Sequence, residues 1–191
     1  MLVKQDSMYY FAYGSNMSSE IFVERRGIQP LEQYNALLQD YRLVFDHKGI
    51  QYLEPCFASL EKQINAQVYG ILYRITPNDV ERLHNSEGNE YRYTKLKVSS
   101  TETGKITCFT YITRHPCRGR KPSRRYMSKL IAGALEHGLP EVYIKELRKV
   151  ETFHLPVVSH AVDILAKVII PYLAQGNALK IPFLKIGVKK D

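Results

Sequence analysis

Tryptophan is absent from this chain of 191 residues, and cysteine is scarce. The three cysteines, Cys56, Cys108 and Cys117, are an odd number, lie far apart and include no Cys-x-x-Cys pair. Disulfide frameworks need paired cysteines in an oxidising compartment. The sequence therefore predicts free thiols in a reducing compartment, and we expect a cytoplasmic protein.

Long apolar runs and targeting signals are also lacking. The first ten residues, MLVKQDSMYY, do not show the charged and then apolar segments of a signal peptide. No uncharged apolar run approaches the roughly 18 residues that a membrane-spanning helix needs. The best candidate, 161–173, is interrupted by Asp163, Lys167 and Pro171, so we expect a buried or dimer-forming helix there and no membrane span.

Motifs for metal, nucleotide and triad chemistry are missing as well. The six histidines form no HExxH motif and no cluster with cysteine at ligand spacing. His115 and Cys117 come closest to a zinc pair, but they are isolated in a basic loop. There is no GxSxG elbow and no GxxxxGK phosphate loop. Hydrolase triads and nucleoside triphosphate chemistry are therefore not indicated.

Positive charge is concentrated in one place. The formal net charge is +8, and the segment 114–125 contains six lysine or arginine residues and no acid. Such a segment can contact nucleic-acid phosphates, or it can attract an acidic small substrate. It has no interleaved aromatic residues for stacking bases. A solvated loop rich in glycine and proline is therefore the favoured interpretation, and nucleic acid is not the expected partner.

Alternating and periodic apolar residues predict both strands and helices. Strands are expected at 8–13, 41–45, 56–60, 68–75, 91–99 and 106–112. Helices are expected at 18–27, for a short stretch after Thr76, and at 123–138, 140–153 and 160–174. Consecutive strands with tight turns favour a mostly antiparallel sheet or small barrel with helices packed outside it. The expected fold class is α+β.

Local signals mark several of these boundaries. Ser18, Thr76 and Ser123 can each cap a helix, and Pro77 suits a first helical position. The turn residues 103–105 contain glycine and predict a hairpin between the last two strands.

Three pieces of sequence carry possible chemistry. The segment YFAYGSN at 10–16 reads as a strand that ends in a tight loop before a helix. Successive backbone N–H groups in such a loop suit a carboxylate, or a carbonyl oxygen under attack. Glu87 is expected in a loop after a short helix, and Tyr111 and Tyr126 form an aromatic set. Each piece alone is weak, since glycine-serine-asparagine is an ordinary turn and a lone glutamate is usually solvated.

Together these pieces resemble a known family. The segments YFAYGSN, CFASLE, VYGILYRI, SEGNEYRY, GKITCFTYI and GALEHGLPEVYIKEL follow the order and approximate spacing of γ-glutamylcyclotransferases over about residues 9–150. The resemblance implies a small mixed, mostly antiparallel β-barrel with surrounding helices. It also implies cyclisation of a small γ-glutamyl substrate to 5-oxoproline with release of an amino acid or amine. No metal, cofactor or protein nucleophile is required.

The resemblance also assigns the site residues. Glu87 takes the place of the catalytic glutamate and would act as the single general acid and base, with Glu90 as a rival in the same loop. The residues expected to bind substrate are Tyr10, Phe11, Ala12, Tyr13, Gly14, Ser15, Asn16 and Tyr126. Residues 1–152 form the γ-glutamylcyclotransferase-like domain in this interpretation. Residues 153–191 are a C-terminal helical extension that packs on the domain or forms a homodimer contact.

Three functional hypotheses follow. The leading one is a cyclotransferase for γ-glutamyl amino acids or amides. The second is a branch that acts on γ-glutamyl-amine crosslinks or on a γ-glutamyl-protected biosynthetic intermediate. The third is a non-catalytic module that binds an anionic partner through 114–125. The arginine-rich segment and the residues from 152 onward lie outside the resemblance, so the leaving group stays open.

Overall fold

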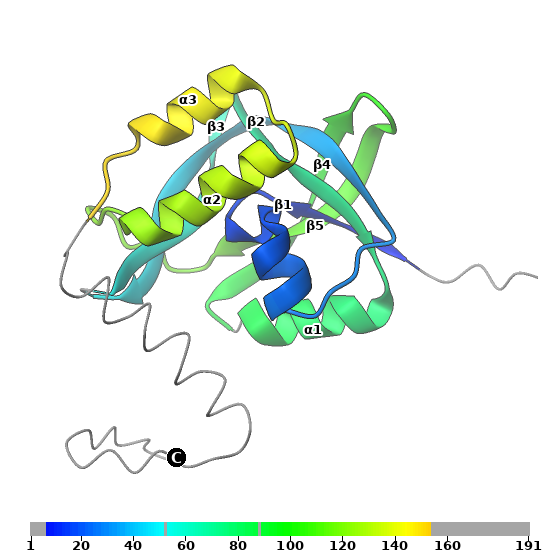
Figure 1. Cartoon of the computed structure of the whole chain (residues 1–191), viewed down its shortest axis with the longest axis horizontal. Coiled ribbons are helices and arrows are strands. Elements are labelled where there is room, and N and C mark those ends of the chain that lie inside the picture. The colour runs from blue at the N-terminus through cyan, green and yellow to red at the C-terminus, as the bar shows by residue number, and fades with distance from the viewer. Residues whose placement is uncertain (1–6, 52, 88, 154–191) are drawn as a thin grey trace, which may run out of the picture. The chain divides into compact units, whose positions relative to one another are not determined.

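Strands in the described part of the chain close into a barrel, shown in Figure 1. The computed structural model describes residues 7–51, 53–87 and 89–153. The strands are β1 (Met8–Ala12), β2 (Glu32–Ile50), β3 (Glu54–Ile75), β4 (Tyr91–Ser100) and β5 (Gly104–Thr113). Their order around the barrel is β1-β3-β2-β4-β5, and all neighbours are antiparallel except β1 and β5. The prediction of a mixed, mostly antiparallel barrel is confirmed.

Two long strands, β2 and β3, form much of the barrel wall. The sequence pattern predicted two separate strands where the structure has the single strand β3, and it predicted only the middle of β2. The β2–β3 pairing contains irregularities at 39–41 and 44–47, which interrupt the alternation of apolar and polar residues. Asp40 and Asn65 take positive φ angles, which these two residue types tolerate, and Asp40 Oδ1 accepts from the Asn65 N–H at 3.1 Å.

The helices are α1 (Pro77–Glu87), α2 (Arg124–Glu136) and α3 (Glu141–Lys149). The predicted cap of α2 is confirmed, because the Ser123 side chain accepts from the Tyr126 N–H at 2.9 Å. The prediction that Glu87 lies in a loop was wrong, since α1 continues to that residue. The helix expected at 140–153 is also shorter than predicted. The helix at 160–174 and the extension beyond 153 lie outside the described residues.

The helix expected at 18–27 has a different form. A 3₁₀ turn η1 (Ser15–Met17) is followed by a π-helix η2 (Glu20–Arg25), with Ser19 rather than Ser18 at its N-cap. The chain leaves η2 through Gly27, whose φ is +65°. This left-handed conformation explains why the helix ends near residue 27, as predicted, because glycine adopts it without a steric cost. No helix among the described residues is long and apolar enough to cross a membrane.

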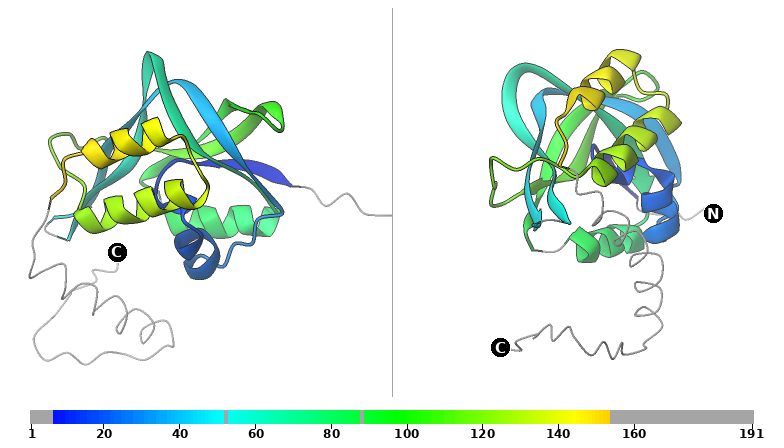
Figure 2. Two further views of the ribbon diagram at one scale, coloured as in Figure 1. Left: turned by 45° about the horizontal axis from the view of Figure 1, so that its top comes forward. Right: turned by 60° about the vertical axis from the view of Figure 1, so that its left-hand side comes forward.

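Helix α2 holds the β1–η1 loop in place. Figures 1 and 2 show α2 and α3 side by side over the barrel, with η1 close to α2. Gly133 permits this approach, since a Cβ there would lie 2.6 Å from Ser18 N and 2.7 Å from the Met17 carbonyl carbon. These are backbone atoms, so they cannot rotate away as a flexible side chain can. The loop that contains Asn16 is therefore positioned by a backbone contact.

This contact predicts a loss of stability for Gly133→Ala. The added methyl group would force α2 away from η1, and we expect the free energy of unfolding to fall by about 1 to 3 kcal/mol. Urea unfolding measures the change. Ala132→Ser, at an exposed position on the same helix, is the control and should stay close to wild type. Equal stability of the two variants would show that the contact is not tight.

Candidate active site

A cavity of about 280 Å³ lies where the β1–η1 loop meets the end of α1. Its volume is close to the lower end of the range for small-ligand pockets, roughly 300 to 1,000 Å³. The lining residues are Tyr10, Tyr13, Gly14, Ser15, Asn16, Arg26, His47, Phe57, Ala58, Ser86, Glu87, Tyr91, Tyr111 and Tyr126. Segments far apart in the sequence therefore build one polar and aromatic cavity.

Most of the predicted site residues meet in this cavity. Glu87, Tyr126 and the loop residues Tyr13 to Asn16 line it together with Tyr10. Phe11 and Ala12 do not, because their side chains are completely buried in the hydrophobic core. Glu90 is exposed and lies outside the lining. Among the described lining residues, Glu87 is the only one with a carboxylate.

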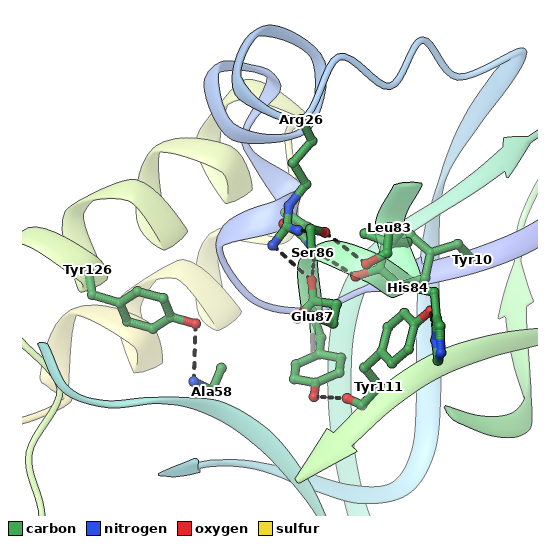
Figure 3. Close-up of polar contacts among 11 residues, drawn as sticks. Tyr10, Arg26, Ala58, Leu83, His84, Ser86, Glu87, Tyr111 and Tyr126 are labelled. Atoms are coloured by element: carbon green, nitrogen blue, oxygen red, sulfur yellow. Dashed lines mark hydrogen bonds and ion pairs between the residues drawn. The ribbon is translucent and has the colours of Figure 1, made fainter. Parts of the chain in front are cut away.

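Glu87 is held by two side chains, of which Figure 3 labels Arg26. Its Oε1 accepts from Asn16 Nδ2 at 3.0 Å and lies 2.8 Å from Arg26 Nη2. Arg26 Nε also donates to Asn16 Oδ1 at 2.8 Å, so the three residues form a closed triangle. The Glu87 side chain is only 11% exposed. A carboxylate at that depth needs such partners, because burial without them would be costly.

The partners of Glu87 are themselves fixed. Asn16 Nδ2 donates to the Tyr10 hydroxyl at 2.9 Å, and Arg26 donates to the Ser86 hydroxyl. Ser86 in turn donates to the Leu83 carbonyl within α1. The carboxylate orientation is therefore set by side chains from β1, η1, the residue after η2 and α1.

Tyr126 reaches the cavity from the first turn of α2 (Figure 3). Its hydroxyl accepts from the Ala58 N–H at 3.1 Å, and a Cβ on Gly14 would lie 3.1 Å from it. Burial raises the pKa of Tyr126 to about 12, although hydrogen bonds from the Ala58 and Ser15 N–H groups lower it. The phenol therefore stays protonated at neutral pH and can donate to a substrate oxygen.

The other cavity phenols are also neutral. Burial raises the pKa of Tyr10, Tyr13, Tyr91 and Tyr111 well above the ordinary value, and the charge of Glu87 contributes in each case. The Tyr13 hydroxyl, on the residue after β1, donates to the Tyr111 carbonyl of β5. The cavity thus combines the triangle of Glu87, Asn16 and Arg26 with uncharged hydroxyl groups.

Arg26, His47, Phe57 and Tyr91 are cavity residues that the sequence did not indicate. Arg26 looks no different in sequence from its neighbour Arg25, which pairs with Glu20 at the surface. His47 and Phe57 are partners in the β2–β3 pairing, and Tyr91 comes from β4, so no local pattern marks the three residues. The glycine after Arg26 was the one available signal, since it ends the helix there.

The cysteines take no part in the cavity lining. All three are free thiols, as the sequence predicts. Burial raises the pKa of both Cys56 and Cys108 to about 12. Neither thiol therefore forms the nucleophilic thiolate at neutral pH.

The basic segment 114–125 is bonded to the barrel through several of its arginines. Arg118 donates to Glu61 at 2.7 Å, and Arg125 Nε donates to Glu54 at 2.8 Å. Both carboxylates belong to β3. Part of the positive charge is therefore used to fasten the segment onto the chain itself.

Comparison with known proteins identifies the family of the chain. Residues 67–147 match the model of the AIG2-like family. The γ-glutamylcyclotransferase of Bos taurus is 31% identical over 153 residues, which cover 76% of this chain and 80% of that protein. The chain belongs to the γ-glutamylcyclotransferase family. The protein is accordingly an enzyme of this family, built on the barrel described above.

Other relatives agree with this assignment. The γ-glutamyl cyclotransferase gliK of Claviceps purpurea is 31% identical over 143 residues, covering 69% of this chain and 64% of that protein. A solved γ-glutamyl cyclotransferase structure superimposes with a TM-score of 0.71 at 25% identity, over 85% of this chain and 99% of the other. The two chains therefore share one fold over nearly all of the solved protein and most of this chain.

Proposed function

We propose that this protein cyclises γ-glutamyl amino acids or amides to 5-oxoproline, with Glu87 as general acid and base. The observation that carries the proposal is the position of Glu87. It is the one carboxylate among the described cavity residues, and Asn16 and Arg26 hold it in a fixed orientation. Family membership supports the reaction class.

The substrate brings its own nucleophile. Its α-amine attacks the γ-carbonyl carbon, a new C–N bond closes a five-membered ring, and the original amide C–N bond breaks. Because both reacting groups belong to one molecule, holding the chain curled supplies much of the rate. A cavity of this size suits a curled γ-glutamyl group.

Glu87 accounts for the proton transfers. The carboxylate takes a proton from the attacking α-amine and gives it to the nitrogen of the departing amine. One carboxylate can serve both steps if it stays between the two nitrogens. The hydrogen bond from Asn16 and the ion pair with Arg26 limit its movement.

Negative charge that develops on the γ-carbonyl oxygen needs hydrogen-bond donors. The candidates on the side of the cavity formed by η1 and α2 are the Tyr126 hydroxyl and the backbone N–H groups of the loop at 14–16, except that of Ser15, which is bonded to Tyr126. Donors fixed in advance stabilise such charge without having to reorganise during the reaction.

Tyr126→Phe tests the contribution of this hydroxyl. We expect kcat/KM to fall by about tenfold to a hundredfold, because one donor to the substrate is lost while the ring is retained. Steady-state rates of 5-oxoproline formation measure the effect. Tyr143→Phe is the matched control, since that hydroxyl is buried without a hydrogen-bond partner among the described residues and lies outside the cavity lining. Equal rates for the two variants would remove Tyr126 from the mechanism.

The proposal itself is tested with a panel of γ-glutamyl dipeptides and γ-glutamyl amines. Mass spectrometry should detect 5-oxoproline and the free amine in equal amounts. Turnover of amines alone would favour the branch that acts on γ-glutamyl-amine crosslinks. Failure with every member of the panel, by a folded protein, would contradict the proposed activity.

A further inference from the structure

An aromatic wall, defined as His47, Phe57 and Tyr91, forms part of the cavity. The His47 ring on β2 stacks on the Tyr91 ring on β4, with centroids 3.8 Å apart and planes inclined by 13°. Phe57 on β3 lies 6.0 Å from His47 and meets Tyr126 edge to face at 5.2 Å. Three strands thus contribute neighbouring aromatic rings to the cavity lining.

The proposed reaction uses no atom of this wall. Its acid and base come from the end of α1, and its hydrogen-bond donors come from the loop at 14–16 and from α2. The nitrogen of the departing amine must nevertheless receive a proton from Glu87, and the rest of the leaving group must extend away from that carboxylate. The remaining lining of the cavity is therefore available to the leaving group.

The wall carries little charge. His47 Nδ1 is within hydrogen-bond distance of Thr113 Oγ1, at 3.1 Å, so one ring nitrogen is already occupied. Burial lowers the pKa of His47, with an opposing effect from the carboxylate of Glu90, so the ring is neutral at neutral pH. Among the described lining residues, Arg26 is the only permanent cation, and it is paired with Glu87. An acidic side chain on the leaving group would therefore find no unpaired cation among the described lining residues. Arg114 lies outside this lining, and its Nε donates to the Tyr91 carbonyl at 3.0 Å.

We infer that His47, Phe57 and Tyr91 form a leaving-group subsite that selects an uncharged, apolar or aromatic amine over an acidic one. This inference rests on the proposed function, because it names the preferred substrate class of the same cavity. Aromatic rings add contact with Phe57 and Tyr91 beyond the burial of their surface. Small leaving groups gain none of this contact, and acidic ones lose hydration without an ionic partner in the described lining.

Three dipeptides test the subsite: γ-glutamylphenylalanine, γ-glutamylglycine and γ-glutamylglutamate. We expect kcat/KM of the wild type to be at least about tenfold higher for the phenylalanine substrate than for the other two. Phe57→Ala and His47→Ala, prepared separately, should reduce this ratio to about twofold or less, because kcat/KM falls more for the phenylalanine substrate than for γ-glutamylglycine. Thermal unfolding identifies any variant that fails to fold.

The outcomes separate the subsite from the reaction. Equal kcat/KM for the three substrates, or a preference for γ-glutamylglutamate, would overturn the subsite while the cyclotransferase function stands. If no 5-oxoproline forms from any substrate, the proposed function is contradicted and the rates do not test the subsite. Calorimetric binding of the same dipeptides to Glu87→Gln then decides the subsite independently. Tighter binding of the phenylalanine dipeptide supports it, and equal binding contradicts it.

Discussion

Replacing Glu87 by glutamine is expected to lower kcat for 5-oxoproline formation by about a hundredfold to ten-thousandfold. Glutamine has nearly the same shape, and its carbonyl oxygen can still accept from Asn16. It cannot take a proton from the substrate amine, so the acid and base step is lost. Steady-state kinetics with a γ-glutamyl dipeptide measure the change, and thermal unfolding checks that the fold is retained.

Glu90→Gln is the matched control for this variant. Glu90 lies three residues further along the chain, is exposed and is outside the cavity lining. Its substitution should leave kcat within about a factor of two of wild type, as is usual for an exposed side chain. If Glu90→Gln lost activity while Glu87→Gln kept more than a tenth of it, the assignment of the base would have to be exchanged.

Arg26→Met is expected to reduce kcat by about tenfold to a hundredfold, with a smaller change in KM. The long apolar side chain keeps much of the packing but removes the ion pair with Glu87 and the hydrogen bond to Asn16. A carboxylate that is free to move by about 1 Å loses a catalytic contribution of this size. Arg26→Lys should recover part of the rate, because a single cation can replace the ion pair but not the second contact.

The neighbouring Arg25 supplies the control for Arg26. It pairs with Glu20, and both side chains are half-exposed at the surface. Surface ion pairs contribute little, so Arg25→Met should behave like wild type in activity and stability. Comparable activity in the Arg25 and Arg26 variants would mean that Arg26 does not position Glu87.

The barrel was largely predictable from the sequence because its signals are local. The hairpin of β4 and β5 follows from alternating residues around a glycine turn, and Gly104 does have a positive φ of +69°. The cap at Ser123 is likewise a contact between near neighbours. The lengths of β2 and β3 were not predictable, because their bulges break the alternation on which strand prediction depends.

The site was predictable only in part, for a similar reason. The motif residues Asn16 and Glu87 carry a family pattern, whereas the Arg26 side chain that joins them comes from the end of a π-helix with no distinctive sequence. Phe11 was included with the loop because it belongs to the motif. In the structure it fills the core instead, since successive side chains of a strand point to opposite faces.

The central claim is an attack by the substrate's own amine, assisted by Glu87, and one isotope experiment tests it most directly. The reaction is run with a γ-glutamyl dipeptide in water enriched in heavy oxygen, and the products are analysed by mass spectrometry. Intramolecular cyclisation predicts 5-oxoproline without the heavy isotope, in equal amount to the released amino acid. Release of glutamate that contains one heavy oxygen would mean that water attacks the γ-carbonyl, and this result would contradict the account.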